Sequence, residues 1–312
     1  MFGRILKLKR FIFLLLTLAL FGFLFMGCLD NTQTEDIPLS DADNVLDNEN
    51  STKETDLSEN KIEKESPEIF TSMTDDIWNS ADMEHSGFSN KDDFLTETKY
   101  YIAAISDFTS RKDKTYKIEY KFTDGVSMAY SSSNVIELKK DLFEHALAPI
   151  AHETTHIVCP NKNSTSLSEG FAEYCQDIFG KNPSPQSYGL DADAWTNYLL
   201  DSSPDSFEIL FPDIGNSGIK DTFIYNELRQ FFYLLSSSFV KYLINSYGID
   251  NFMLLYESDN LKNDYDNIYE KPFDDLKAEW RQYIENYSEP ISAQNLQDYL
   301  YELYTSHNFP MG

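Results

Sequence analysis

The sequence predicts an α+β protein in which a small antiparallel sheet lobe is followed by a mainly helical lobe. Apolar residues alternate with charged ones between residues 117 and 138, a pattern typical of strands. Apolar residues recur at helical spacing between residues 70 and 109 and again beyond residue 221. With 23 Phe and 20 Tyr among its 312 residues, the chain can bury a sizeable core in one domain or two small lobes.

Residues 1–28 have the pattern of a secretory signal, with a basic start, an apolar run from Phe11 to Met26, and then Gly27-Cys28. The alternative is an N-terminal membrane helix, because the run is near the short end of a spanning length. The segment Leu24–Cys28 resembles the lipobox of bacterial lipoproteins, which implies that Cys28 is lipidated and becomes the new N-terminus. We therefore expect a lipid anchor that holds the chain on the extracytoplasmic face of a bacterial cell membrane.

Residues 29–67 are dominated by Asp, Glu, Asn, Ser and Thr, and they contain no aromatic residue. Such a segment cannot bury enough apolar surface to offset the entropy lost on folding. We therefore predict an acidic disordered tether between the anchor and a folded domain over residues 68–288. Apolar residues at helical spacing within residues 289–312 predict a C-terminal helix that packs on this domain.

The chain is strongly acidic, with 52 Asp and Glu against 25 Lys and Arg and a formal net charge of −27. No acidic residue precedes Cys28, so the part beyond the signal segment is more acidic still. Nucleic acid and anionic lipid headgroups carry charge of the same sign, and we do not expect either to bind the folded part.

The segment between residues 117 and 138 predicts two strands and a turn. Ile118, Tyr120 and Phe122 alternate with charged residues, and Asp124-Gly125 marks a turn before the run that ends at Leu138. We expect a hairpin here. Its second strand, residues 134–138, is either an edge strand that could pair with an extended peptide or an ordinary sheet edge.

Residues 152–156 read His-Glu-Thr-Thr-His, an HExxH motif. The motif lies in a helical segment over residues 142–158, and Pro149 predicts that its regular part begins there. Helical residues four apart share a face, so His152 and His156 can bind one metal ion while Glu153 reaches a water molecule beside it. Because HExxH strings also occur by chance, the motif alone is not decisive.

A second motif, Leu-Ser-Glu-Gly-Phe-Ala-Glu-Tyr over residues 167–174, supplies a third metal ligand. The connection of residues 157–168 is long enough for a turn and an antiparallel return helix that brings Glu169 back. Two histidines and one carboxylate are a known ligand set of catalytic zinc. Glu173 lies one turn further and can accept the other ring N–H of a ligand histidine. The alternative is that both glutamates belong to a solvated helix face.

Together these motifs resemble the gluzincin zinc metallopeptidases, especially the peptidase MA-like group. Tyr247-Gly248 and the segment Asp275–Trp280 are similar to the helical part of that group, so the resemblance covers residues 117–287. It implies a zincin-like active-site helix between the two lobes and hydrolysis of a peptide or protein substrate. It also implies that Zn²⁺ is held by His152, His156 and Glu169, with Glu153 as general base. A non-catalytic surface lipoprotein with the same fold and a zinc hydrolase of non-peptide substrates are the alternatives.

The resemblance also implies a catalytic tyrosine. Tyr233 matches a tyrosine that faces the metal and donates a hydrogen bond to the developing oxyanion, a contact made mainly in the transition state. The alternative is a core tyrosine, in which case Tyr225 or Tyr242 would take this role.

The remaining histidines and cysteines have weaker patterns. His145 lies two helical turns before His152, so we expect a residue at the rim of the site and not a ligand. Cys159 and Cys175 each follow one ligand segment. They could form a disulfide that joins two helices, or they could remain two free buried thiols.

Overall fold

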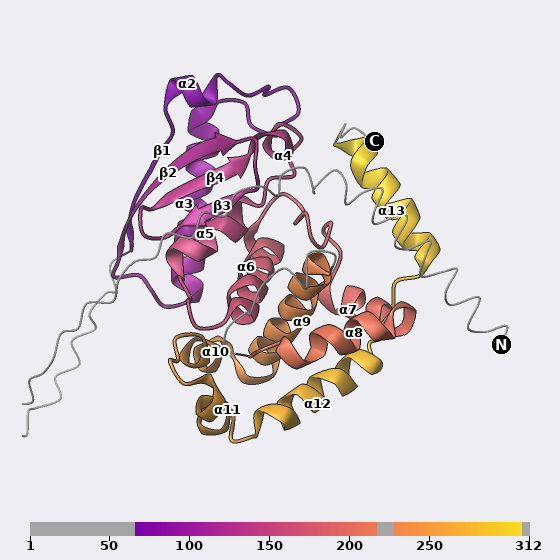
Figure 1. Cartoon of the computed structure of the whole chain (residues 1–312). Coiled ribbons are helices and arrows are strands. Elements are labelled where there is room, and N and C mark those ends of the chain that lie inside the picture. Colours follow the sequence, from indigo (N-terminus) through magenta and orange to yellow (C-terminus); the bar gives the residue numbers. More distant parts are fainter. Residues whose placement is uncertain (1–65, 217–227, 308–312) are drawn as a thin grey trace, which may run out of the picture.

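The computed structural model describes residues 66–216 and 228–307 and has α+β architecture. A four-stranded sheet with its helices forms one part of the molecule, and helices α6 to α12 form the other (Figure 1). The predicted signal segment with Cys28 and nearly all of the predicted tether lie outside the described residues. Within the described residues, no helix is long and apolar enough to cross a membrane.

The sheet has the strand order β1-β2-β4-β3 and is mixed. Strand β2 pairs in parallel with both β1 and β4, and only β3 is antiparallel to its neighbour β4. The prediction of an antiparallel sheet is therefore wrong, although the sheet is as small as expected. The four strands are β1 (Glu68–Ser72), β2 (Thr115–Thr123), β3 (Met128–Tyr130) and β4 (Val135–Lys139).

The predicted hairpin turn at Asp124-Gly125 is also wrong. The strand that follows β2 in the sequence, β3, does not pair with β2 but forms an edge of the sheet. The next strand, β4, then fills the position between β2 and β3. The hairpin turn thus lies between β3 and β4, where Asn134 has a φ of 55°. Strand β4 is consequently an interior strand, and β3 is the edge strand on this side of the sheet. Side-chain alternation reports which face a strand buries, but it does not report the direction of the neighbouring strand.

Strand β1 was not predicted, because residues 70–109 were expected to be helical. It is a five-residue edge strand, too short to show a period, and its Phe70 is exposed. The helical spacing is confirmed further on, in α3 (Lys91–Phe108), which begins at Asn90, whose side chain accepts a hydrogen bond from the backbone N–H of Asp93. The short α2 (Asp75–Trp78) and α3 connect β1 to β2 and allow the two strands to run in parallel.

Helix α5 (Ile150–Val158) lies between the two parts of the molecule. It begins directly after Pro149, as predicted, and follows the short α4 (Lys140–Glu144). It contacts α3, β3 and β4 on one side and α6 (Thr165–Phe179) on the other. Of the nine α5 residues, all except His156 are buried.

The helical part is built around α6 and α9 (Arg229–Tyr247), which pack along each other. Helix α9 ends at Gly248, where φ is 88°. The predicted C-terminal helix is α13 (Ala293–Ser306), which buries Leu296 and Leu300. The other helices are α7 (Ala192–Ser202), α8 (Pro204–Leu210), α10 (Ile249–Tyr256), α11 (Leu261–Tyr269) and α12 (Phe273–Glu285).

Gly170 allows α6 and α9 to approach closely. A Cβ atom at this position would lie 2.4 Å from the backbone oxygen of Ser236 on α9 and 2.9 Å from a methyl carbon of Val240. Backbone atoms in the middle of a helix cannot move aside as a flexible side chain can. Any larger residue at Gly170 must therefore push the two helices apart.

We expect the Gly170→Ala variant to lose about 1–3 kcal/mol of its free energy of unfolding, the range typical of overpacked cores. The measurement is denaturant unfolding followed by circular dichroism. The control is Gly125→Ala, because a Cβ at Gly125 would meet only the Thr123 hydroxyl at 3.4 Å. Equal stability of the Gly170→Ala variant and the wild type would show that the close approach of the helices is not required.

Candidate metal centre

The turn between α5 and α6 sets the position of the third predicted ligand. The Asn161 side chain accepts hydrogen bonds from the backbone N–H groups of Asn163 and Ser164, at 2.8 and 3.0 Å. Ser164 then caps α6, because its hydroxyl accepts a hydrogen bond from the N–H of Leu167 at 3.1 Å. Glu169 lies in the second turn of the helix that this cap begins.

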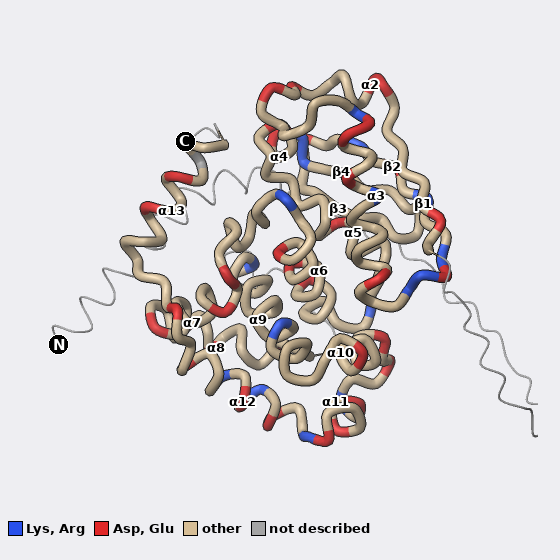
Figure 2. The backbone as a smooth tube through the Cα atoms, turned by 180° about the vertical axis from the view of Figure 1, so that it is seen from behind, with Lys and Arg blue, Asp and Glu red and all other residues tan. Residues whose placement is uncertain are grey.

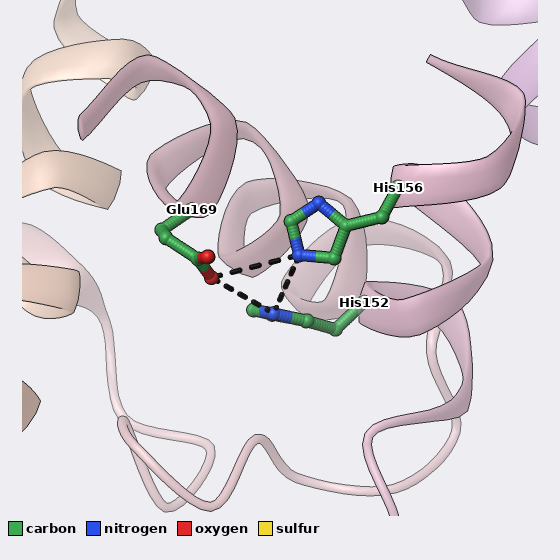
Figure 3. A group of neighbouring side chains, drawn as sticks. All are labelled: His152, His156 and Glu169. Atoms are coloured by element: carbon green, nitrogen blue, oxygen red, sulfur yellow. Dashed lines mark hydrogen bonds and ion pairs between the residues drawn. The ribbon is translucent and has the colours of Figure 1, made fainter. Parts of the chain in front are cut away.

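The structure brings His152, His156 and Glu169 together, as predicted (Figure 3). The Nε2 atoms of the two histidines lie 3.2 Å apart. The Oε2 atom of Glu169 lies 3.3 Å from Nε2 of His152 and 3.5 Å from Nε2 of His156. Three potential ligand atoms from α5 and α6 thus form a nearly equilateral triangle, and the three residues could hold a metal ion.

This triangle has the dimensions of one face of a tetrahedral coordination site. Bonds from zinc to histidine nitrogen or carboxylate oxygen are about 2.0–2.2 Å long, so neighbouring ligand atoms of a tetrahedral site lie about 3.3–3.6 Å apart. The observed distances of 3.2, 3.3 and 3.5 Å lie within about 0.1 Å of this range. The spacing of the three atoms therefore suits a tetrahedral metal, in which a fourth position would take water or substrate.

Glu173 lies against the first histidine, where it was predicted. Its Oε1 atom is 2.9 Å from Nδ1 of His152, an ion-pair distance, and among the described residues neither atom has a hydrogen-bond partner that meets the usual geometry. The other oxygen of Glu173 accepts a hydrogen bond from the hydroxyl of Ser184. A carboxylate at Nδ1 keeps the proton on that nitrogen and leaves Nε2 free to bind a metal.

Two further supporting residues were not predicted. The side-chain oxygen of Gln176 accepts a hydrogen bond from the backbone N–H of His152 at 2.9 Å, and the hydroxyl of Ser168 lies 3.3 Å from Nδ1 of His156. Ser168 precedes Glu169 directly, and Gln176 lies one turn beyond Glu173. The only signal in the sequence was that Ser168 lies within the second motif and Gln176 two residues after it, and this did not indicate which atoms they contact.

The electrostatics of the centre follow from burial and from the proximity of the histidines. Burial opposes ionisation of Glu169, but His156 and His152 outweigh it and hold the pKa of this carboxyl well below its usual value. Burial disfavours protonation of His152, yet Glu169 and Glu173 raise its pKa well above the ordinary value. Burial also raises the pKa of Glu153, although the two histidines oppose that shift.

Glu153 is 5% exposed, and no described residue donates a hydrogen bond or forms a salt bridge to its carboxylate. The charges that act on it are those of the two histidines, Glu169 and Glu173. Because a buried carboxylate without a donor is costly, this arrangement leaves Glu153 free to accept a proton or hydrogen bond from a bound molecule.

Tyr233 lies at the centre and is 7% exposed. Its ring centroid is 6.4 Å from that of His152, and burial together with the charge of Glu169 raises its pKa. The alternative Tyr242 donates its hydroxyl to Glu279 on α12, and Tyr225 lies outside the described residues. Of the two described candidates, Tyr233 is the one that lies beside a ligand. It has a partner that sequence reasoning missed, Arg229, whose Nε and Nη2 atoms lie 3.0 and 2.8 Å from the phenol oxygen.

Cys159 and Cys175 are two free, buried thiols, and the alternative of a disulfide is not what the structure contains. Cys159 ends α5, and its thiol donates a weak hydrogen bond to the Thr109 hydroxyl at 3.6 Å. Burial raises the pKa of Cys159 to about 11.

His145 lies at the end of α4, where its Nδ1 is 2.8 Å from the backbone oxygen of Asp141. It does not belong to the ligand group.

Comparisons of the chain with protein-family models, with curated proteins and with solved structures gave no match. The chemistry of the centre is therefore argued from the side chains themselves.

We expect the Glu173→Ala variant to bind zinc about 10–100-fold more weakly than the wild type, because the carboxylate that orients His152 is lost. Competition with a chromophoric chelator measures this affinity. The matched control is Glu279→Ala, which removes a carboxylate that Lys271 holds on α12, outside the ligand group. Unchanged zinc affinity in the Glu173→Ala variant would contradict the orienting role.

We expect Cys159 and Cys175 to resist iodoacetamide at neutral pH in the folded protein, because the thiolate is the reacting form and both thiols are buried. Both should react once the protein is unfolded. Mass spectrometry of proteolytic peptides separates these two sites from Cys28. Detection of a peptide pair joined through Cys159 and Cys175, or alkylation in the folded state, would contradict this expectation.

Proposed function

We propose that this chain is a zinc-dependent peptidase of the gluzincin type, with a zincin-like active-site helix in α5. One observation carries the proposal: three ligand atoms converge at a spacing that suits a tetrahedral metal, and the buried carboxylate of Glu153 lies within electrostatic range of both histidines. A bound zinc ion would polarise the scissile carbonyl and make the attacking water more acidic. The known His₂Glu ligand set of catalytic zinc supports this choice of metal.

The remaining steps belong to side chains of this protein. Glu153 accepts the proton of the attacking water and passes it to the leaving amine. Glu173 keeps His152 in the tautomer that presents Nε2. Tyr233 donates its hydroxyl to the oxyanion that forms as the carbonyl carbon becomes tetrahedral.

The position of β3 supports a peptide as substrate. This short strand is one of the two edges of the sheet, and it contacts the helix that carries both histidines. Met128 and Tyr130 on β3 are 42% and 40% exposed, and Tyr130 lies within electrostatic range of Glu153. An extended peptide can add to such an edge through its backbone hydrogen bonds.

The proposed place of action is the extracytoplasmic face of a bacterial cell membrane, with the body tethered to lipid at Cys28. The lipobox-like segment and the acidic linker composition support this part of the proposal. The acidic residues are spread over both parts of the folded body (Figure 2), which favours neutral or basic substrates over anionic ones.

We expect the Glu153→Gln variant to bind one zinc ion per chain, as the wild type does, and to lose peptide hydrolysis by about 10²–10⁴-fold. Zinc content by elemental mass spectrometry and digestion of a peptide library are measured side by side. The matched control is Glu144→Gln, which changes a carboxylate on α4 that pairs with Lys140 and leaves the metal centre intact.

The outcomes separate the three candidate functions. Full activity of the Glu153→Gln variant would contradict the mechanism. A zinc-loaded wild type that cleaves no peptide would favour a binding module, or a hydrolase of other substrates. A wild type that binds no zinc would contradict both enzyme hypotheses.

A further inference from the structure

Arg229 begins α9 one turn before Tyr233, so the two side chains lie on the same face of the helix. Both Nε and Nη2 of Arg229 donate hydrogen bonds to the phenol oxygen of Tyr233, at 3.0 and 2.8 Å. The guanidinium carbon also lies 5.3 Å from the centre of the Tyr233 ring. The start of α9 is anchored independently, because the Gln230 side chain donates to the backbone oxygen of Gln186 at 2.8 Å.

The guanidinium lies within electrostatic range of the metal centre. Among the described residues Arg229 forms no salt bridge, and after Tyr233 the charges that raise its pKa are those of Glu169 and Glu153. Glu169 belongs to the ligand group, and Glu153 directly follows the candidate ligand His152 in the sequence. Arg229 is thus a cation held at the edge of an otherwise acidic centre without a carboxylate of its own.

Two donors on the phenol oxygen determine what that oxygen can still do. A phenol oxygen accepts with its lone pairs and donates through a single O–H. Because Arg229 occupies the acceptor side, the O–H is left to donate away from Arg229. The Tyr233 ring centroid lies 6.4 Å from that of His152, so the O–H that remains free is held close to the ligand group.

We propose that Arg229 is a positioning residue that acts through Tyr233: it holds the phenol in place and keeps its O–H available for the developing oxyanion. This inference rests on the proposed peptidase function and deepens it. The positive charge of Arg229 beside the phenol also makes the O–H a stronger donor in the transition state. The alternative is that Arg229 binds the C-terminal carboxylate of a substrate directly.

A double-mutant cycle separates the two roles. The variants are Arg229→Met, Arg229→Lys, Tyr233→Phe, and Arg229→Met combined with Tyr233→Phe. Each is assayed for kcat and KM on a peptide that the wild type cleaves, with a free and with an amidated C-terminus. Arg281→Met is the matched control, because Arg281 pairs with Glu208 and Glu285 on the outer helices.

Tyr233→Phe should lower kcat by about 100-fold, a typical effect of losing one oxyanion donor. Arg229→Met should lower kcat by at least about tenfold and leave KM within about twofold, because the contact acts in the transition state. Arg229→Lys should recover part of the loss. The double variant should be no slower than Tyr233→Phe alone, and Arg281→Met should match the wild type.

A second readout does not depend on activity. In protein with ¹³C-labelled tyrosine, the ring carbon that bears the hydroxyl of Tyr233 is identified as the resonance that Tyr233→Phe removes. The proposal expects this resonance to move in the metal-free Arg229→Met variant and to stay in place in Arg281→Met.

Two outcomes would overturn the proposal in favour of direct substrate binding. One is that the losses of kcat in the two single variants multiply in the double variant. The other is that Arg229→Met changes only KM, and only for substrates with a free C-terminal carboxylate. An unmoved Tyr233 resonance in Arg229→Met would overturn it as well. A zinc-loaded wild type that cleaves no peptide contradicts the proposed function itself, whereas an active wild type with multiplying losses contradicts the role of Arg229 alone.

Discussion

Helix α6 lies between α5 and α9, and the geometry of the metal centre depends on this placement. Two ligands come from α5 and one from α6, so neither helix can form the centre alone. Helix α6 approaches α9 closely at Gly170, the residue that follows the candidate ligand Glu169 in the sequence. The same contact brings Tyr233 of α9 to the histidines. One close helix contact thus sets the relative positions of the ligands and the residues proposed to act on substrate.

The charges gathered at the centre would favour a bound cation. Three carboxylates, Glu153, Glu169 and Glu173, lie beside two histidines in a buried or half-buried environment. Arg229 is the cation that the described residues supply to them. With neutral histidines, the carboxylates exceed that single positive charge by two, an imbalance that is costly away from water. A divalent metal ion would remove the imbalance and satisfy the three ligand atoms at the same time.

Local spacing is enough to predict the helices of the site, whereas contacts between distant segments are not. HExxH and Glu169 can be predicted because helical spacing places side chains on one face whatever the rest of the chain does. The direction of β4 cannot, because alternation carries no information about the neighbouring strand. The role of Arg229 depends on a phenol that faces the ligands only in the folded chain. The bonding state of Cys159 and Cys175 is open in the sequence for the same reason, since a disulfide requires a specific distance and orientation.

Anomalous X-ray diffraction at the zinc absorption edge, from crystals of the wild type equilibrated with zinc, tests the metal centre most directly. The account predicts one strong peak about 2.0–2.2 Å from Nε2 of His152, Nε2 of His156 and a carboxylate oxygen of Glu169. A zinc-equilibrated crystal with no peak between these three side chains, or with zinc bound only elsewhere, would contradict it.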